Sequence, residues 1–193
     1  MRSFGNAYKN AQASIGGEFK RLPAGGYIVE IVDVKDVPAK EYLQVIFDIA
    51  TGEYRGFYAD AWGKEHPAAH SIYRSYKPDN MGYFKGFISC VDKSNGTNFG
   101  SLYEGDEPVN EKLLIGKRFG VIIGYEEYKT DRGDVRERTY VVQNRSTQGI
   151  EAWLQDVASG KEKLPELKKL KPEATPVSPV PGFEGLKESE IPF

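Results

Sequence analysis

The sequence contains a single cysteine, Cys90, so no disulfide bond can form within the chain. A lone thiol is typical of proteins from reducing compartments. The N-terminal residues include no apolar segment of the secretory type, and no apolar run approaches the ~18 residues that span a bilayer. We therefore expect a cytoplasmic protein that is neither secreted nor inserted in a membrane.

Patterns for metal binding and catalysis are also scarce. His66 and His70 are the only histidines, Pro67 lies between them, and no fourth ligand has a suitable spacing. Neither a glycine-rich phosphate loop nor a Gly-x-Ser-x-Gly turn is present. The sequence therefore predicts no metal, no cofactor and no enzymatic activity.

Strand-like patterns dominate what is present. Residues 42–50 alternate, with Leu43, Val45, Phe47 and Ile49 on one face, as in a strand with one buried side. β-branched runs and alternation predict four further strands. These lie at residues 27–34, 54–62, 117–128 and 135–145, the last two joined as a hairpin.

One helix is expected between the third and fourth strands, because Met81, Phe84, Ile88 and Val91 recur at helical spacing. Three strands, a helix and two strands is the order of an oligonucleotide-binding (OB) fold, a five-stranded Greek-key barrel. We therefore predict a mainly β, OB-like fold, with an extra helix at 147–158. A different small barrel or an open sheet with one helix is the alternative.

Composition divides the chain into four parts. Residues 1–24 are a polar leader without periodicity, and 25–158 form the OB-like domain. Residues 159–183 are rich in Lys and Pro, including four prolines in PEATPVSPVP, and are expected to be a flexible linker. An acidic tail, EGLKESEIPF, occupies residues 184–193.

The tail has the chemistry of a partner-binding peptide. Glu188 and Glu190 supply charge, Ile191 and Phe193 supply apolar anchors, and Pro192 restricts the backbone before docking. A hydrophobic slot rimmed by Lys or Arg on another protein would accept such an end.

An acidic stretch followed by Ile-Pro-Phe resembles the C-terminus of bacterial and phage single-stranded DNA-binding proteins, although this tail is less acidic than their usual aspartate run. The body is similar to phage proteins of this type in LPAGGYIVEIVDVKDVPAKEYLQVIFDI (22–49), SYKPDNMGYFKGFISCVDKSN (75–95) and LKKLKP (167–172). The resemblance implies an OB-like fold and single-strand binding without sequence preference. It also implies partners in DNA replication, recombination and repair in the cytoplasm of a bacterial host.

Such binding needs cations for phosphates and aromatic rings for bases, and two segments interleave both types. We predict contacts to DNA from the third strand and following loop, at Tyr54, Arg55, Tyr58, Trp62, Tyr73, Arg74, Tyr76 and Lys77. The closing hairpin is predicted to add Tyr125, Tyr128, Lys129, Arg132, Arg136, Arg138 and Tyr140. Single aromatics on half-buried strands usually belong to the core, so the prediction depends on the clustering of both types.

The sequence thus predicts a protein that coats single-stranded DNA and recruits other proteins, with self-association possible. Two alternatives stay open. A protein-only adaptor would use the tail alone, and a metal-dependent nuclease would use carboxylates such as Asp48, Glu53 and Asp60.

Overall fold

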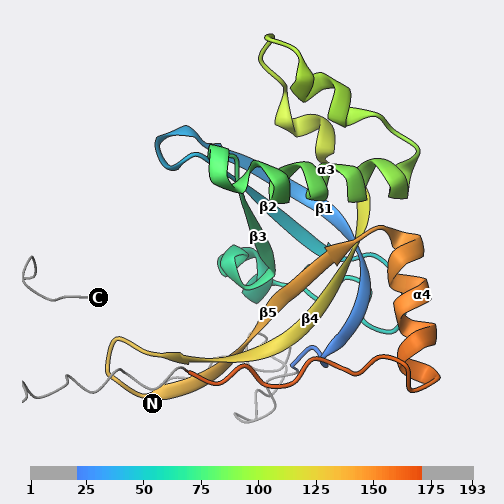
Figure 1. The fold of residues 1–193 in the computed structure, drawn as a ribbon. Coiled ribbons are helices and arrows are strands. Elements are labelled where there is room, and N and C mark those ends of the chain that lie inside the picture. Colours follow the sequence, from blue (N-terminus) through green and yellow to red (C-terminus); the bar gives the residue numbers. More distant parts are fainter. Residues whose placement is uncertain (1–20, 171–193) are drawn as a thin grey trace, which may run out of the picture.

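Five strands form one strongly curved antiparallel sheet in the computed structural model, which describes residues 21–170 (Figure 1). The strand order is β3-β2-β1-β4-β5, with β1 at the centre. No ladder joins β3 to β5 within the described residues, so the sheet is open. The strands are β1 (Gly25–Val37), β2 (Tyr42–Ile49), β3 (Ser71–Ser75), β4 (Arg118–Lys129) and β5 (Val135–Arg145).

Within residues 21–170, three α-helices accompany the sheet: α2 (Ala61–Glu65), α3 (Met81–Asn95) and α4 (Thr147–Ala158). The expected helix between the third and fourth strands is confirmed as α3, which buries Phe84, Phe87, Ile88 and Val91. It ends at Gly96, whose positive φ of 63° closes the last turn. Short 3-10 turns are η1 (Pro38–Lys40), η2 (Pro67–His70), η3 (Pro78–Asn80), η4 (Phe99–Glu104) and η5 (Glu111–Leu114).

The main core lies between the concave face of the sheet and α3. The alternation in β2 is confirmed, because Leu43, Val45, Phe47 and Ile49 are all buried there. The ring of Phe47 packs edge-on against Phe119 of β4, with ring centroids 6.2 Å apart. Side chains from β2, β4 and α3 therefore share one apolar interior.

The extra helix is confirmed as α4, which packs on the opposite, convex face of β1 and β4. Ile150 and Trp153 are buried there with Ile122. Glycines on the strands permit the close approach: a Cβ on Gly120 would lie 2.0 Å from Cγ1 of Ile150, and one on Gly26 would lie 3.0 Å from the Trp153 ring. This face of the sheet is therefore covered by α4.

The predicted third strand at 54–62 is wrong. Gly52 and Gly56 have positive φ and lie in turns, and the chain then enters α2, where Asp60 accepts a hydrogen bond from the backbone N–H of Gly63 at 2.8 Å. The backbone N–H of Tyr58 donates to the carboxylate of Asp48 instead of to a neighbouring strand. The third strand is β3, further along the chain.

Both ends of the described chain are attached to the sheet. Leu22 is only 1% exposed, and its carbonyl accepts a hydrogen bond from the Tyr125 hydroxyl, so the leader contributes to the core. Lys168 exchanges backbone hydrogen bonds of 2.9 Å with Tyr125 and Glu127 of β4, beyond the point where β1 begins. Residues 159–170, expected to be part of the flexible linker, therefore end in a segment bound along β4 (Figure 1).

Candidate nucleic-acid interface

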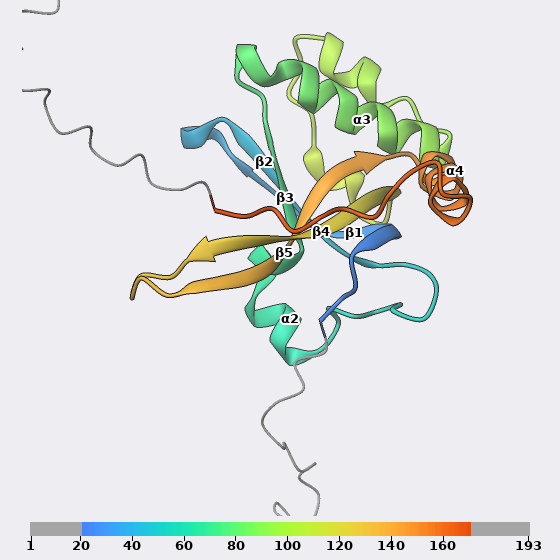
Figure 2. The same ribbon diagram turned by 60° about the horizontal axis from the view of Figure 1, so that its bottom comes forward.

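The β4–β5 hairpin projects from the body of the fold (Figure 2). Its register pairs Tyr128 with Arg136, Glu126 with Arg138, and Gly124 with Tyr140. Alternation along each strand places these six residues on the same face. We call Tyr128, Arg136, Arg138, Tyr140 and the adjoining Lys168 the hairpin surface.

Glu126 lies at the centre of the hairpin surface and binds two of its cations. Its carboxylate is 2.8 Å from Arg138 and 3.1 Å from Lys168. Burial raises the pKa of this carboxyl, but hydrogen bonds from Lys168 and Arg138 outweigh burial and hold the pKa below its usual value. Two positive charges therefore face one negative charge.

The same cations lie over tyrosine rings. The Arg138 guanidinium is 5.1 Å from the centroid of Tyr128, and Lys168 Nζ is 5.1 Å from that of Tyr140. Cation–ring contacts of this length are weakly attractive at an exposed site. They hold the rings and the charges side by side.

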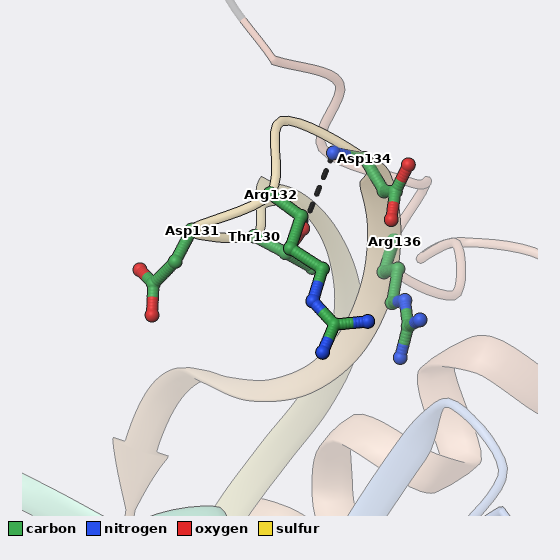
Figure 3. A pocket seen from close by; sticks show the side chains of 5 residues that line it. All are labelled: Thr130, Asp131, Arg132, Asp134 and Arg136. Atoms are coloured by element: carbon green, nitrogen blue, oxygen red, sulfur yellow. Dashed lines mark hydrogen bonds between the residues drawn. The ribbon is translucent and has the colours of Figure 1, made fainter.

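At the hairpin turn, Arg132 lies beside Arg136 of the hairpin surface. Arg132 and Arg136 line a hollow of about 330 Å³, and their guanidinium groups point in the same direction, with the carboxylates of Asp131 and Asp134 to either side of them (Figure 3). Neither arginine forms an ion pair with a described residue. The turn is closed by a hydrogen bond of 3.2 Å from the Asp134 backbone N–H to the Thr130 hydroxyl.

Tyr125 differs from the other predicted hairpin aromatics. It is adjacent to Glu126 and so points to the opposite face of β4, where the guanidinium of Arg21 covers its ring at 3.9 Å. The structure therefore does not place Tyr125 on the hairpin surface.

The predicted residues of β3 meet β5 across the open side of the sheet. Arg74 donates a hydrogen bond to the Asn144 side chain and another, of 3.2 Å, to the carbonyl of Tyr73. A groove of about 560 Å³ lies between these two strand edges. Tyr73 is 47% exposed beside this groove.

Tyr76 and Lys77, which follow β3, have different environments. The Tyr76 hydroxyl donates to Asp36 at 2.8 Å, and its ring packs edge-on against Phe84. Burial, followed by the hydrogen bond to Asp36 and its charge, raises the pKa of Tyr76 to about 12. Tyr76 is thus engaged with the body of the fold, whereas Lys77 is exposed.

Tyr58 cannot stack on a base in this structure. Only 4% of it is exposed, and its ring stacks on that of His70 with centroids 4.5 Å apart. Burial raises the pKa of its hydroxyl to about 12. In a strand over 54–62, Tyr58 would lie on the same face as Tyr54 and Trp62; this segment forms turns and α2 instead.

The other predicted residues of this segment belong to the turn region around α2. Tyr54 packs against Tyr27 and Phe57, and Trp62 stacks on His66 with ring centroids 4.8 Å apart. Arg55 is exposed. Sequence proximity therefore grouped these residues with β3, but the fold assigns them to a different part of the molecule.

Two of the three carboxylates considered for a nuclease, Asp48 and Asp60, have structural contacts. Asp48 accepts from two backbone N–H groups, and Asp60 caps α2. Across residues 21–170, no three His, Cys, Asp or Glu side chains come together as a metal site. In that same part of the chain, no helix has the length and apolar character needed to cross a bilayer.

Sequence reasoning missed Tyr83, which is 76% exposed on α3 and lines the groove beside Tyr73. The signal was present, because Tyr83 lies off the apolar stripe of its helix, where an aromatic residue is unusual. It also missed Lys168, which was assigned to the linker. The predicted tail residues Glu188, Glu190, Ile191, Pro192 and Phe193 lie outside the described residues.

No protein-family model matches the chain, and a search of curated proteins finds no significant match.

Proposed function

We propose that this protein binds single-stranded DNA without sequence preference, and that its sheet is an incompletely closed OB barrel. The order β3-β2-β1-β4-β5, with α3 between β3 and β4, is compatible with an OB barrel whose last pairing, β3 with β5, is missing. The observation that carries the functional proposal is the hairpin surface, where cations and tyrosine rings share one face of β4 and β5.

The two residue types supply the two parts of single-strand binding. Arg136, Arg138 and Lys168 pair with phosphates, while Tyr128 and Tyr140 stack on bases. Stacking of a base on an aromatic ring contributes about 1–3 kcal/mol and tolerates any base, because every base has a π-face. No sequence preference is therefore expected.

The formal net charge of the chain is −2, so binding to DNA must come from a local patch of positive charge. Long-range attraction between the protein and DNA is weak, and affinity depends on the contacts at the hairpin surface. We infer steep salt dependence, with log K falling by ~0.7 per phosphate contacted on a single strand.

In this proposal, the protein coats and protects single strands during replication, recombination and repair of a bacteriophage genome in the host cytoplasm. The C-terminal residues Glu188 to Phe193 recruit partner proteins. A chain lacking residues 184–193 should keep its DNA affinity within a few-fold and lose partner capture.

The test is a fluorescence polarisation titration of labelled oligo-dT and an equal-length duplex with Arg136→Ala and Tyr140→Ala variants. Each substitution should weaken single-strand binding about fivefold to a hundredfold, in line with the loss of one stacked base or phosphate contact. Arg55→Ala is the matched control, since Arg55 is exposed but lies outside the hairpin surface.

Unchanged affinity in both hairpin variants would remove the hairpin surface as the binding site. Absence of single-strand binding by the wild-type protein at low salt would overturn the proposed DNA-binding function. An adaptor that binds only other proteins would then be the favoured function. Cleavage of the labelled oligonucleotide in the presence of Mg²⁺ would instead favour the metal-dependent nuclease.

A further inference from the structure

The groove between β3 and β5 is lined on one side by two glycines and a cysteine of α3. Gly82, Gly86 and Cys90 follow one another at intervals of four along α3, so they line the groove from one helix face. A Cβ on Gly82 or Gly86 would meet no atom within 4 Å. The space above this half of α3 is therefore open to a ligand, between the edges of β3 and β5.

One wall of the groove holds a cation without a counter-charge. Arg74 forms no ion pair with a described residue, and its buried Nε has no hydrogen-bond partner among them. Burial lowers the pKa of its guanidinium. No Asp or Glu lines the groove. Within the described part of the chain, Arg74 has only neutral partners, the Tyr73 carbonyl, the Asn144 side chain and the Phe87 ring, so no opposite charge offsets its partial burial and this wall is complementary to an anion.

The rest of the lining is polar and aromatic. Asn80, Gln143 and Asn144 carry amides, which both donate and accept hydrogen bonds, as the edges of nucleobases do. Tyr73 and Tyr83 offer exposed rings to a base face. A nucleotide combines all three matching features: an anionic phosphate, a base edge that forms hydrogen bonds and a flat aromatic base.

We propose that the groove holds one nucleotide of the bound single strand, with Arg74 on its phosphate and the base over Gly82 and Gly86 beside Tyr83. This inference rests on the proposed DNA-binding function and extends it to a second site. Arg136 and Asn144 lie on the same strand, β5, about 26 Å apart at ~3.3 Å per residue. A single strand that crosses the hairpin surface therefore reaches the groove.

Selection against duplex DNA follows from this site. A base can enter the groove only when it is unpaired and unstacked, which costs a few kcal/mol in a duplex and much less in a single strand. The hairpin surface alone has no such requirement, because cations attract the phosphates of either form.

The first test fills the groove. Gly86→Phe places a ring in open space on α3, and Gly105→Phe is the control, because Gly105 lies outside the groove with an ordinary φ of −90°. We expect Gly86→Phe to weaken oligo-dT binding at least tenfold and to reduce the preference for single strands over duplex. Gly105→Phe should stay within twofold, and both variants should keep the wild-type melting temperature.

The second test uses Cys90, the only cysteine, as a reporter of groove occupancy in the unaltered protein. Saturating oligo-dT should slow reaction of Cys90 with a small maleimide at least fivefold, whereas duplex and free dTMP at the same phosphate concentration should not. Polarisation on the same samples establishes whether oligo-dT is bound.

The outcomes separate the two proposals. Bound oligo-dT without protection of Cys90, together with wild-type affinity in Gly86→Phe, would overturn the groove site and leave the hairpin surface intact. Protection by dTMP but not by oligo-dT would show a free-nucleotide site and also overturn the inference. Failure of oligo-dT to bind the wild-type protein would overturn the proposed function itself.

Discussion

Replacing Glu126 with Gln should strengthen DNA binding while weakening the fold. Glu126 is 15% exposed and accepts ion pairs from Arg138 and Lys168, whose side chains are about 60% exposed. Each pair involves a screened surface cation, so each contributes about 0.2–1 kcal/mol. We therefore expect Glu126→Gln to lower the free energy of unfolding by roughly 0.4–2 kcal/mol at neutral pH.

The effect on stability should depend on pH in a defined direction. The pKa of Glu126 is lower in the folded protein than its usual value, so its charged form stabilises the fold above that value. This stabilisation disappears as the pH falls through the folded-state pKa. The difference between wild type and Glu126→Gln in urea unfolding should accordingly be largest near neutral pH and vanish in acid.

The effect on DNA binding has the opposite sign. The variant frees Arg138 and Lys168 from a competing carboxylate, and one further phosphate contact at 0.1 M salt corresponds to about fivefold in affinity. The salt slope should become steeper by ~0.7 for that contact. Polarisation with oligo-dT across a salt series measures both quantities.

Glu137→Gln is the matched control, because Glu137 pairs with Arg21 on the opposite face of the hairpin and the net charge changes equally. Its affinity should rise much less than that of Glu126→Gln. Equal effects of the two variants would mean that overall charge governs binding. Weaker binding by Glu126→Gln would refute the assignment of phosphates to Arg138 and Lys168.

Three further predictions concern the fold. Gly120→Ala should lower the free energy of unfolding by about 1–3 kcal/mol, because the new methyl group overlaps Ile150; urea denaturation checks this, with Gly105→Ala as the unaffected control. His70→Leu should cost about 1–3 kcal/mol in the same assay, since the variant removes the contacts of the His70 ring nitrogens with the backbone carbonyls of Phe47 and Gly63. Leu22→Ala should cost about 2–5 kcal/mol, whereas an effect below 0.5 kcal/mol would show that the leader is not part of the core.

The elements that were predicted correctly are those whose hydrophobic pattern lies entirely within one continuous segment. The alternation of β2 and the four-residue spacing of Phe84 and Ile88 in α3 each identify a buried face without reference to any other segment. The β4–β5 hairpin is similar, because its strands are neighbours in the chain. Its candidate residues Arg136, Arg138 and Tyr140 consequently lie on one face, as the pairing register requires.

The errors arose where the decision depended on distant contacts. Residues 54–62 alternate like a strand, but hydrogen bonds donated to the carboxylates of Asp48 and Asp60 hold them in turns and in the start of α2. Leu22 looked like part of a polar leader, although the Tyr125 hydroxyl and the core hold it in place. In each case a deciding partner, Asp48 or Tyr125, lies outside the segment whose periodicity was read.

Side-chain period is a local property of the backbone, so the apolar faces of β2 and α3 could be identified from the amino-acid sequence alone. The sequence also determined which segments carry cations together with tyrosines. The burial of Tyr58 on His70, the position of Lys168 in the hairpin surface and the groove beside Arg74 follow from the three-dimensional arrangement of distant segments. Burial and charge compensation are sums over neighbours in space, and chain folding alone brings those neighbours together.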